Sequence, residues 1–138
     1  MLVDQAMSRD VRIARPEQPI RDIAKIMADE DIGSLPVGDN DRLVGMITDR
    51  DITVRAVAQG LGPDTQVSKV MTSDVKYCFD DEDTDEVARN MSEEQVRRLP
   101  VVNRDKRLVG ILALADLANN DQDSATATAV EGISRPKN

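Results

Sequence analysis

Hydrophobic residues recur at helical spacing in two stretches of the chain. The first stretch has apolar residues at positions i, i+3, i+4 and i+7, namely Ile20, Ile23, Ala24 and Met27. This is the stripe of an amphipathic helix, and Pro19 suits its first turn. The second stretch keeps the stripe at Val87, Ala88 and Met91. There Asp83 and Glu86 are spaced as a capping pair, so we expect one amphipathic helix in each stretch.

Short apolar runs around these helices predict strands. Two strands are predicted before the helices, over 11–14 and 75–78. Leu-Pro-Val runs follow the helices, at 35–37 and 99–101, and the next strands are predicted over 43–47 and 108–112. A polar hairpin loop is predicted at 39–41. A last helix runs from about Asp49 to Gln59, where Gly60 suits its C-terminal cap. The order in each half is strand, helix, strand, strand, helix.

The chain repeats itself. A shift of 64 positions superposes Met7, Asp10, Val11, Ala24, Met27 and Leu35-Pro36-Val37 on Met71, Asp74, Val75, Ala88, Met91 and Leu99-Pro100-Val101. After one inserted residue the shift is 65, and Arg-Leu-Val-Gly at 42–45 falls on 107–110. A repeat of this length indicates two copies of one supersecondary unit. We therefore expect a first copy at 1–60, a linker at 61–69, a second copy at 70–118 and a flexible or loosely docked C-terminal tail at 119–138.

Composition narrows the chemistry. The 138 residues include 18 Lys and Arg against 26 Asp and Glu, for a net charge of −8, with no histidine and one cysteine. The shortage of imidazole and thiol groups argues against zinc, haem and Ser-His or Cys-His catalysis, so we expect no catalytic residue, no metal and no enzyme. The acidic balance disfavours nucleic acid and anionic membranes as partners. Without a signal peptide, a disulfide or a long apolar run, the cytoplasm is the expected location.

The segment 45–51, Gly-Met-Ile-Thr-Asp-Arg-Asp, joins a predicted strand to a predicted helix. Thr48 and Asp51 are spaced as a capping box, so the plain interpretation is a helix start. The second copy has Ala113 and Asp116 at these positions, so the hydroxyl is lost while the acid is kept. A carboxylate accepts two hydrogen bonds side by side, which matches the vicinal hydroxyls of a ribose. Because the arginine before the acid and the helix-start N–H groups favour a phosphate, the segment also predicts a nucleoside phosphate site.

Both copies resemble CBS motifs, named for cystathionine β-synthase, and residues 3–118 resemble a tandem CBS pair, or Bateman module. The paired Leu-Pro-Val runs, the paired Arg-Leu-Val-Gly runs and the Gly-x-x-Thr-x-Arg-Asp segment carry the resemblance, which is strongest to the small stand-alone bacterial members. It implies an α/β (α+β) fold in which two motifs pack by their sheets about a pseudo-two-fold axis, with two clefts. It also implies a flat homodimer that senses or regulates by binding AMP, ADP, ATP or S-adenosylmethionine.

The resemblance places nucleotide-binding residues in both clefts. In the first cleft the ribose would lie on Asp51 with Thr48, and the phosphate near Arg50. The base side and rim of this cleft would be lined from the second copy by Lys76, Tyr77, Val96 and Arg97, and Arg98 would also reach the phosphate. The second cleft would bind the ribose through Asp116, with the base surrounded by Arg12, Ile13, Ile32, Gly33 and Ser34. Alanines at 113 and 115 replace the hydroxyl and the arginine there, so we expect the first cleft to be preferred.

Several of these residues also suit a purely structural position. Arg97 and Arg98 are adjacent, so in an extended segment they point to opposite sides, and one of them is solvated or ion-paired. Tyr77 suits packing within a strand, and Cys78 suits a buried apolar position. The acidic run at 80–86 lacks the glycine and glutamate spacing of a calcium loop, so we interpret it as a solvated turn.

Three functions remain open on these grounds. The first is a non-catalytic regulatory module that binds an adenosine nucleotide between the copies and requires no other cofactor, with S-adenosylmethionine as an alternative ligand. Such a ligand would act by favouring one arrangement of the copies. The second is a ligand-independent dimeric scaffold that displays an acidic surface to an unidentified protein partner. The third, an enzyme, is disfavoured because the sequence has no nucleophile–base pair and no metal set.

Overall fold

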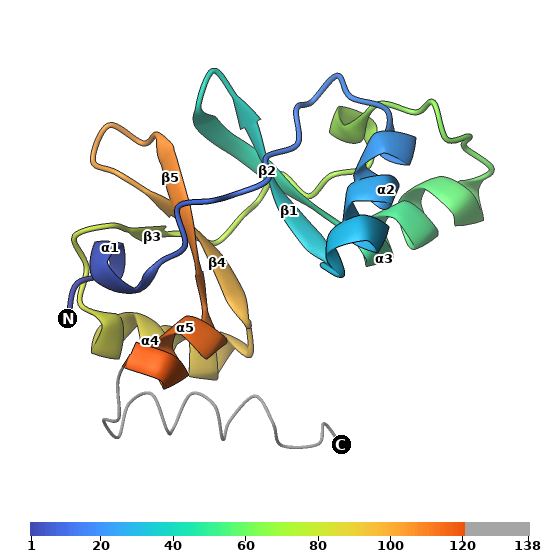
Figure 1. The fold of residues 1–138 in the computed structure, drawn as a ribbon. Helices are drawn as coiled ribbons and strands as arrows, with labels where there is room; N and C mark the ends of the chain where they lie inside the picture. The colour runs from blue at the N-terminus through green and yellow to red at the C-terminus, as the bar shows by residue number, and fades with distance from the viewer. Residues whose placement is uncertain (121–138) are drawn as a thin grey trace. The chain divides into compact units, whose positions relative to one another are not determined.

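The computed structural model describes residues 1–120, which form two compact units. One unit is the continuous segment Arg12–Val75, and the other joins Met1–Val11 to the chain from Lys76 onward. Each unit combines helices with a β-hairpin, which confirms the predicted α/β class (Figure 1). Among the helices that the structure describes, none is both long enough and apolar enough to cross a membrane.

The unit Arg12–Val75 packs its helices against one antiparallel hairpin. Its elements are α2 (Ile20–Glu30), β1 (Ser34–Asp39), β2 (Arg42–Thr48), α3 (Asp49–Asp51), the π-helical turn η1 (Ile52–Ala56) and the 3₁₀ turns η2 (Val57–Gln59) and η3 (Val67–Lys69). The strands are joined at Asn40 and Asp41, whose φ angles are 52° and 65°. Two consecutive positive φ angles are what a type I′ hairpin turn requires. The predicted hairpin loop is therefore confirmed.

The helix α2 buries most of the apolar stripe that predicts it. Ile20, Ile23 and Met27 lie in the core with Leu35 and Ile47 of the hairpin. Ala24, which the spacing assigns to the same stripe, is exposed. Its repeat partner Ala88 is fully buried, so the spacing alone does not decide the exposure at this position.

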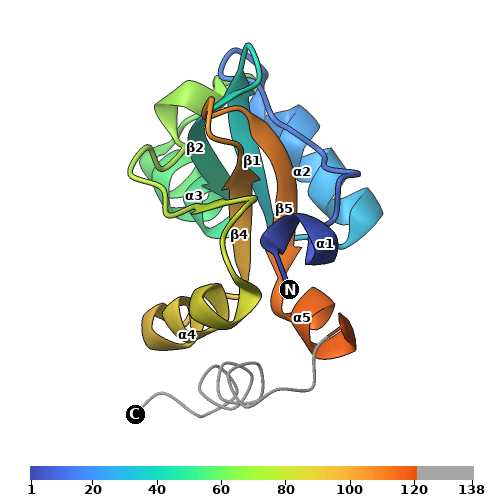
Figure 2. The same ribbon diagram turned by 90° about the vertical axis from the view of Figure 1, so that its left-hand side faces the viewer.

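The second unit adds a short third strand to its hairpin. Its elements are α1 (Val3–Ala6), β3 (Cys78–Phe79), α4 (Thr84–Glu94), β4 (Arg98–Val102), β5 (Leu108–Ala113) and α5 (Leu114–Asn120). In the sheet β3–β4–β5, β3 runs parallel to β4 and β4 antiparallel to β5. The helices α4 and α5 contact each other, and α1 contacts α5 and β5 (Figure 2). The core between them contains Val87, Met91, Leu99, Leu112 and Leu117.

The first predicted strand of each copy is shorter than the apolar runs indicate. Of residues 11–14, only Ala14 joins a sheet, through a single parallel bridge to Val37. Of residues 75–78, only Cys78 lies in a strand, and β3 continues to Phe79. Pro16, which has no N–H, follows the first segment at once, and β4 offers β3 only Val101 and Val102 as parallel partners. The prediction of full strands was therefore wrong at both places.

The predicted last helix of the first copy is continuous but not uniform. It begins as α3, passes through the π-helical turn η1 and ends as the 3₁₀ turn η2. Gly60 ends it in the left-handed conformation with φ 76°, which confirms the predicted cap. Ile52, Thr53 and Val54 are β-branched in succession, and such residues hold an ideal α-helix poorly.

The compact units exchange their leading segments, so they do not follow the order of the repeats. Residues 1–11 precede the first copy but pair with the second, where the N–H groups of Ser8 and Ile111 donate to each other's carbonyl groups at 2.8 and 3.0 Å. Residues 67–75 pair instead with the first copy, where Met46 and Thr72 exchange the same two bonds at 2.9 and 2.8 Å. The compact units therefore group residues 1–11 with the second repeat, while the domain limits of 1–60, 61–69 and 70–118 stay a prediction.

Glycine makes both exchanges sterically feasible. A Cβ atom on Gly110 would lie 2.6 Å from Met7 Sδ and 2.8 Å from the Ser8 carbonyl oxygen. A Cβ atom on Gly45 would lie 2.7 Å from the Thr72 carbonyl oxygen and 2.9 Å from Met71 Sδ. In each copy the methionine side chain packs directly against the glycine, where a side chain on the glycine would collide with it. This contact accounts for the presence of both residues in both copies.

We expect Gly110→Ala and Gly45→Ala each to lower the free energy of unfolding by about 1–3 kcal/mol, because a backbone oxygen has to move to admit the new methyl group. Urea unfolding followed by circular dichroism measures this change. Gly62→Ala is the matched control, since nothing lies within 4 Å of a Cβ atom there. Equal stability of all three variants would contradict the packing described.

Candidate functional site

Thr48 and Asp51 form a complete capping box at the start of the helical run. The Thr48 hydroxyl oxygen accepts the Asp51 N–H at 3.0 Å, and Asp51 Oδ2 accepts the Thr48 N–H at 3.0 Å. The strand β2 ends at Thr48, and α3 begins at the next residue, so the box is placed by the strand-to-helix junction. The structural interpretation of this pair is therefore confirmed, while a ligand role for it stays a prediction.

The Asp51 carboxylate is surrounded by polar groups that the sequence did not identify. Only 8% of the residue is exposed, although it carries a charge. The Thr72 hydroxyl lies 3.4 and 3.5 Å from its two oxygens, and Arg55 Nε lies 3.8 Å from Oδ1. Arg55 stands four residues after Asp51, a spacing that indicates an ion pair on a helix, whereas Thr72 is brought in by the exchanged segment. A buried acid with a hydroxyl and a cation beside it can bind a polyhydroxylated ligand.

The second copy keeps half of this arrangement. The Ala113 N–H donates to Asp116 Oδ2 at 3.1 Å, which repeats the bond between the Thr48 N–H and Asp51. Retention of the acid therefore has a structural cause that needs no ligand, because the acid satisfies a helix-start N–H group in both copies. Ala115 stands where the first copy has Arg50, whose side chain is exposed. The second helix start thus has fewer polar groups than the first.

The structure brings predicted residues of different clefts together at one end of each hairpin. Ser34 is the register partner of Thr48, and the Asp49 N–H donates to the Gly33 carbonyl at 3.0 Å. In the other unit, Arg98 is the register partner of Ala113, and the Leu114 N–H donates to the Arg97 carbonyl at 3.0 Å. The end of each hairpin therefore gathers helix-start and rim residues within one unit.

The residues predicted to line the base lie either in the segment ahead of α2 or α4, or next to the core of their unit. Ile32 and Val96 are partly buried and pack against the two cores, as apolar residues in the loop before a strand do. Ile13 and Tyr77 occupy equivalent repeat positions, and they are 39% and 41% exposed, so both are free to contact a ligand. The Tyr77 ring meets Phe79 edge to face at 5.7 Å.

An ion pair occurs in the same place in both copies. Arg12 Nη1 lies 3.0 Å from Glu30 Oε2, and Lys76 Nζ lies 3.0 Å from Glu94 Oε1. Arg12 and Lys76 occupy equivalent repeat positions ahead of α2 and α4. Each of them pairs with the last residue of the helix that follows it. Both pairs are solvent-exposed, so each contributes less than about 1 kcal/mol to stability. Their main effect is to set the position of a predicted ligand-binding cation.

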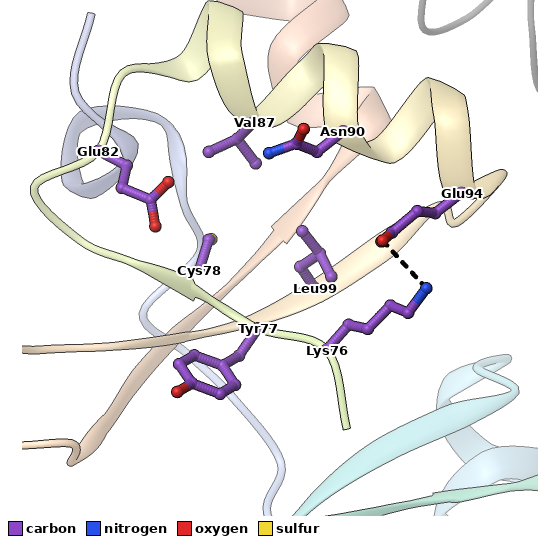
Figure 3. A pocket seen from close by; sticks show the side chains of 8 residues that line it. All are labelled: Lys76, Tyr77, Cys78, Glu82, Val87, Asn90, Glu94 and Leu99. Carbon is purple, nitrogen blue, oxygen red and sulfur yellow. Dashed lines mark ion pairs between the residues drawn. The ribbon is translucent and has the colours of Figure 1, made fainter. Parts of the chain in front are cut away.

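A pocket of about 290 Å³ opens between α4 and the segment that contains β3 (Figure 3). It is lined by eight residues: Lys76, Tyr77, Cys78, Glu82, Val87, Asn90, Glu94 and Leu99. Val87 and Asn90 project from α4 toward Leu99 of β4, Glu82 points in from the loop after β3, and the Lys76–Glu94 ion pair lies at one end. The pocket therefore has an apolar floor and polar walls.

Asp51 and Asp116 belong to different units, and so do Asp51 and Lys76. The assignment of these residues to shared clefts accordingly stays a prediction, and the local geometry above is what each unit contributes by itself.

Comparison with known proteins decides the family. The sequence model of the CBS domain family matches residues 3–57 and 67–123. The chain belongs to the CBS domain family. It is 37% identical over 125 residues to the CBS domain-containing protein YhcV of Bacillus subtilis, covering 91% of this chain and 89% of that protein. It is 38% identical over 132 residues to Hypoxic response protein 1 of Mycobacterium tuberculosis, covering 94% and 92% of the two chains.

Solved CBS structures have the same fold. The crystal structure of Hypoxic Response Protein I with two coordinated zinc ions superposes with a TM-score of 0.78 at 35% identity, covering 88% of this chain and 100% of that one. The CBS pair of MJ0100 in complex with 5′-methylthioadenosine and S-adenosylmethionine gives 0.72 at 33% identity, covering 86% and 94%. CBSX2 in complex with AMP gives 0.75 at 25% identity, covering 86% and 93%. The tandem CBS pair that the resemblance implies is thereby confirmed.

The residues of this chain do not suit the zinc ions that Hypoxic Response Protein I coordinates. The sequence has no histidine and a single cysteine. Within residues 1–120, no three His, Cys, Asp or Glu side chains are grouped so that they could hold a metal ion. Protein zinc sites use mainly imidazole and thiolate ligands, so the donor set of this chain does not fit zinc.

Cys78 is the thiol on the floor of the pocket in the second CBS copy. Burial, and then the carboxylates of Glu82 and Asp80, raise the pKa of this thiol from 9.0 to about 12. Both influences disfavour the thiolate, which is the reactive form. The predicted apolar position of Cys78 is confirmed by its burial, with 3% exposed.

We expect Cys78 to react very slowly with iodoacetamide at pH 8 in the folded protein, because a pKa of about 12 in place of 9.0 leaves about a thousandfold less thiolate. Mass spectrometry of folded and urea-unfolded samples measures the two rates. Because the folded pKa exceeds the unfolded one, this thiol contributes stability below pH 9.0 that is lost as the pH rises toward 12. Equal rates in both samples would show that the thiol is not buried.

Proposed function

We propose that this protein is a non-catalytic regulatory module whose two CBS copies together bind an adenosine nucleotide of the AMP, ADP or ATP class. The observation that carries the proposal is the Asp51 carboxylate, which is 8% exposed, accepts the Thr48 N–H and lies 3.4 Å from the Thr72 hydroxyl. Two carboxylate oxygens held at a strand-to-helix junction match the vicinal hydroxyls of a ribose. Arg50, exposed and adjacent in sequence, supplies a cation for the phosphate.

The ligands of two relatives support adenosine as the shared element. The CBS pair of MJ0100 was solved with 5′-methylthioadenosine and S-adenosylmethionine, and CBSX2 with AMP. Of these ligands only AMP carries a phosphate, so the adenosine is what they have in common. In this chain Arg50 and Arg98 stand at the predicted phosphate positions, which favours a phosphorylated ligand over the cationic S-adenosylmethionine.

The two helix starts support unequal sites. The first has the Thr48 hydroxyl and Arg50, whereas the second has alanines at 113 and 115. Of the two bonds of a capping box, Asp116 makes the one in which it accepts the Ala113 N–H. The other bond needs a side-chain oxygen at position 113, which alanine does not have. Because the first helix start has a hydroxyl and an arginine at positions where the second has alanines, we propose that the site with Asp51 binds more tightly.

Regulation follows from the distribution of the proposed ligand residues. The ribose residue Asp51 belongs to the unit Arg12–Val75, and the base residues Lys76 and Tyr77 belong to the other unit. A ligand that contacts both units stabilises whichever arrangement allows both sets of contacts, by its difference in affinity between arrangements. The output is a change in the surface that a partner protein meets, with no chemical step on the nucleotide.

We expect isothermal titration calorimetry to show binding of AMP or ATP by the wild-type protein, with S-adenosylmethionine weaker. Asp51→Asn is expected to weaken binding roughly 10- to 100-fold, because it removes a charge-assisted hydrogen bond to the ribose. Asp116→Asn is expected to have a smaller effect on the first binding event.

Asp49→Asn is the matched control, since Asp49 is an exposed acid in the same helical turn. Its Oδ1 accepts the Arg50 N–H at 2.8 Å. Its affinity is expected to equal that of the wild type. The proposal fails if none of the three ligands gives heat, or if Asp51→Asn binds as well as the control.

A ligand-independent dimeric scaffold is the second candidate, and an exposed apolar surface favours it. Val54 and Val57 lie on the last helical run of the first copy and Leu61 follows its Gly60 cap, and the three residues are 41%, 67% and 43% exposed. Exposed apolar side chains close together in the chain are typical of a contact surface. This surface is where we propose that two molecules of the protein meet as a homodimer.

We expect Val57→Asp to convert the dimer to a monomer in sedimentation velocity, because a charge at the centre of this surface is desolvated on association. Gln59→Asp, at an exposed position of the same helical run, is the control and should stay dimeric. A monomeric wild type, or a dimeric Val57→Asp variant, would each be evidence against this interface. Nucleotide binding by the monomeric variant would separate the two candidate functions.

A further inference from the structure

The pocket beneath α4 is not equivalent in the two copies. Val87, Asn90 and Glu94 lie on one face of α4, at i, i+3 and i+7. A shift of 64 positions places Ile23, Ile26 and Glu30 on the same face of α2. The outer positions are therefore conserved in character between the copies, and the central one changes from isoleucine to asparagine.

This change alters what the central side chain does. Ile26 packs against the core of its unit. Asn90 is exposed and projects into the pocket, and its amide makes no side-chain hydrogen bond within the part of the chain that the structure describes (Figure 3). An amide in this position leaves one donor and one acceptor available side by side over an apolar floor.

The remaining walls restrict which group the amide can meet. The floor is formed by the buried side chains of Cys78, Val87 and Leu99, which suit a flat apolar face. Glu82 and Glu94 add acceptor oxygens, although Glu82 Oε1 already accepts the Phe79 N–H at 2.9 Å. A ligand edge that presents a donor beside an acceptor therefore pairs fully with the amide, whereas an edge with two acceptors leaves one of them against the amide oxygen or a carboxylate.

Adenine satisfies these conditions. Its 6-amino group donates and the adjacent N7 accepts, and an asparagine amide pairs with both at once. Hypoxanthine presents two acceptors on this edge, the 6-oxygen and N7, so the amide can satisfy only one of them, and the other meets the amide oxygen or a carboxylate. The volume of about 290 Å³ lies at the lower end of ligand pockets, which suits a base without its sugar and phosphate.

We infer that the pocket beneath α4 is the base-binding site of the proposed nucleotide, and that Asn90 is the residue that selects adenine at the 6-position. This inference rests on the proposed function, which already assigns the neighbouring Lys76 and Tyr77 to the base side. It adds a specificity residue on α4, away from the strand-to-helix junctions. It also explains an inequality between the copies that is separate from the loss of the hydroxyl at position 113.

The test compares AMP with IMP, in which an oxygen replaces the 6-amino group and N1 carries a hydrogen. Calorimetry on the full-length wild-type protein is expected to show AMP binding roughly tenfold or more tightly than IMP. Asn90→Ala removes the amide and keeps the space, so it is expected to bring the AMP-to-IMP ratio close to one. Asn90→Ile copies the residue of the first copy, fills the pocket and is expected to weaken both ligands. Glu93→Gln, an exposed neighbour on α4 that does not line the pocket, is the control and should keep the wild-type ratio.

The outcomes separate this inference from the function on which it rests. If the wild type binds AMP and IMP equally, or if Asn90→Ala keeps the wild-type ratio, the assignment of Asn90 is wrong while nucleotide binding stands. If the wild type binds neither nucleotide, the proposed function itself fails. Thermal unfolding of each variant confirms that the folded state is retained, because the side chain of Asn90 is exposed and its replacement removes no core contact.

Discussion

The close approach of a methionine-bearing segment to a glycine is the constraint on which both units depend. In each copy the second hairpin strand has a glycine, Gly45 or Gly110, where the sulfur and backbone of the exchanged segment lie against it. This contact completes the hairpin edge with two backbone hydrogen bonds and carries Thr72 to Asp51. The polar surroundings of that acid therefore depend on packing that lies outside the motif in which the acid is found.

The helix-start acid shows how a structural task and a binding task coexist in one side chain. Asp51 uses one oxygen to accept the Thr48 N–H, which any helix start needs to satisfy. Its other oxygen faces Thr72 and Arg55, groups that a helix start does not require. In the second copy, Asp116 retains the first of these tasks through the Ala113 N–H. Sequence retention of the acid alone is therefore weak support for a ligand, and the surroundings of the first site are stronger support.

The repeat made the fold predictable, because every helix and hairpin could be read twice. The hairpins, the helices α2 and α4 and the cap at Gly60 follow from periodicity and turn chemistry that act locally. The first strands of each copy could not be predicted in length, since a parallel strand depends on partners that are distant in sequence. The π-helical turn and the exposure of Ala24 likewise depend on packing against the hairpin.

Residues of the candidate site that are close together in the sequence were predicted, and residues that other segments bring in were missed. Thr48 and Asp51 are three residues apart, and their spacing alone identifies the capping box. Thr72 was missed because the exchanged segment delivers it, although its repeat partner Ser8 makes the same bridge in the other unit. Asn90 was missed because a polar residue on a helix is usually solvated. Comparing the two copies at that position, isoleucine against asparagine, is the signal that could have revealed it.

The exchange of leading segments has a consequence for what a single copy could do on its own. A polypeptide of residues 1–66 alone would lack the segment around Thr72 that packs over Gly45. Its own leading segment, residues 1–11, would lack the strand β5 with which it pairs. Such a polypeptide satisfies both needs only by trading segments with another molecule, as in domain swapping. Fusion of two copies in one chain turns that intermolecular trade into an internal one, and each half is then dependent on its twin for a complete edge.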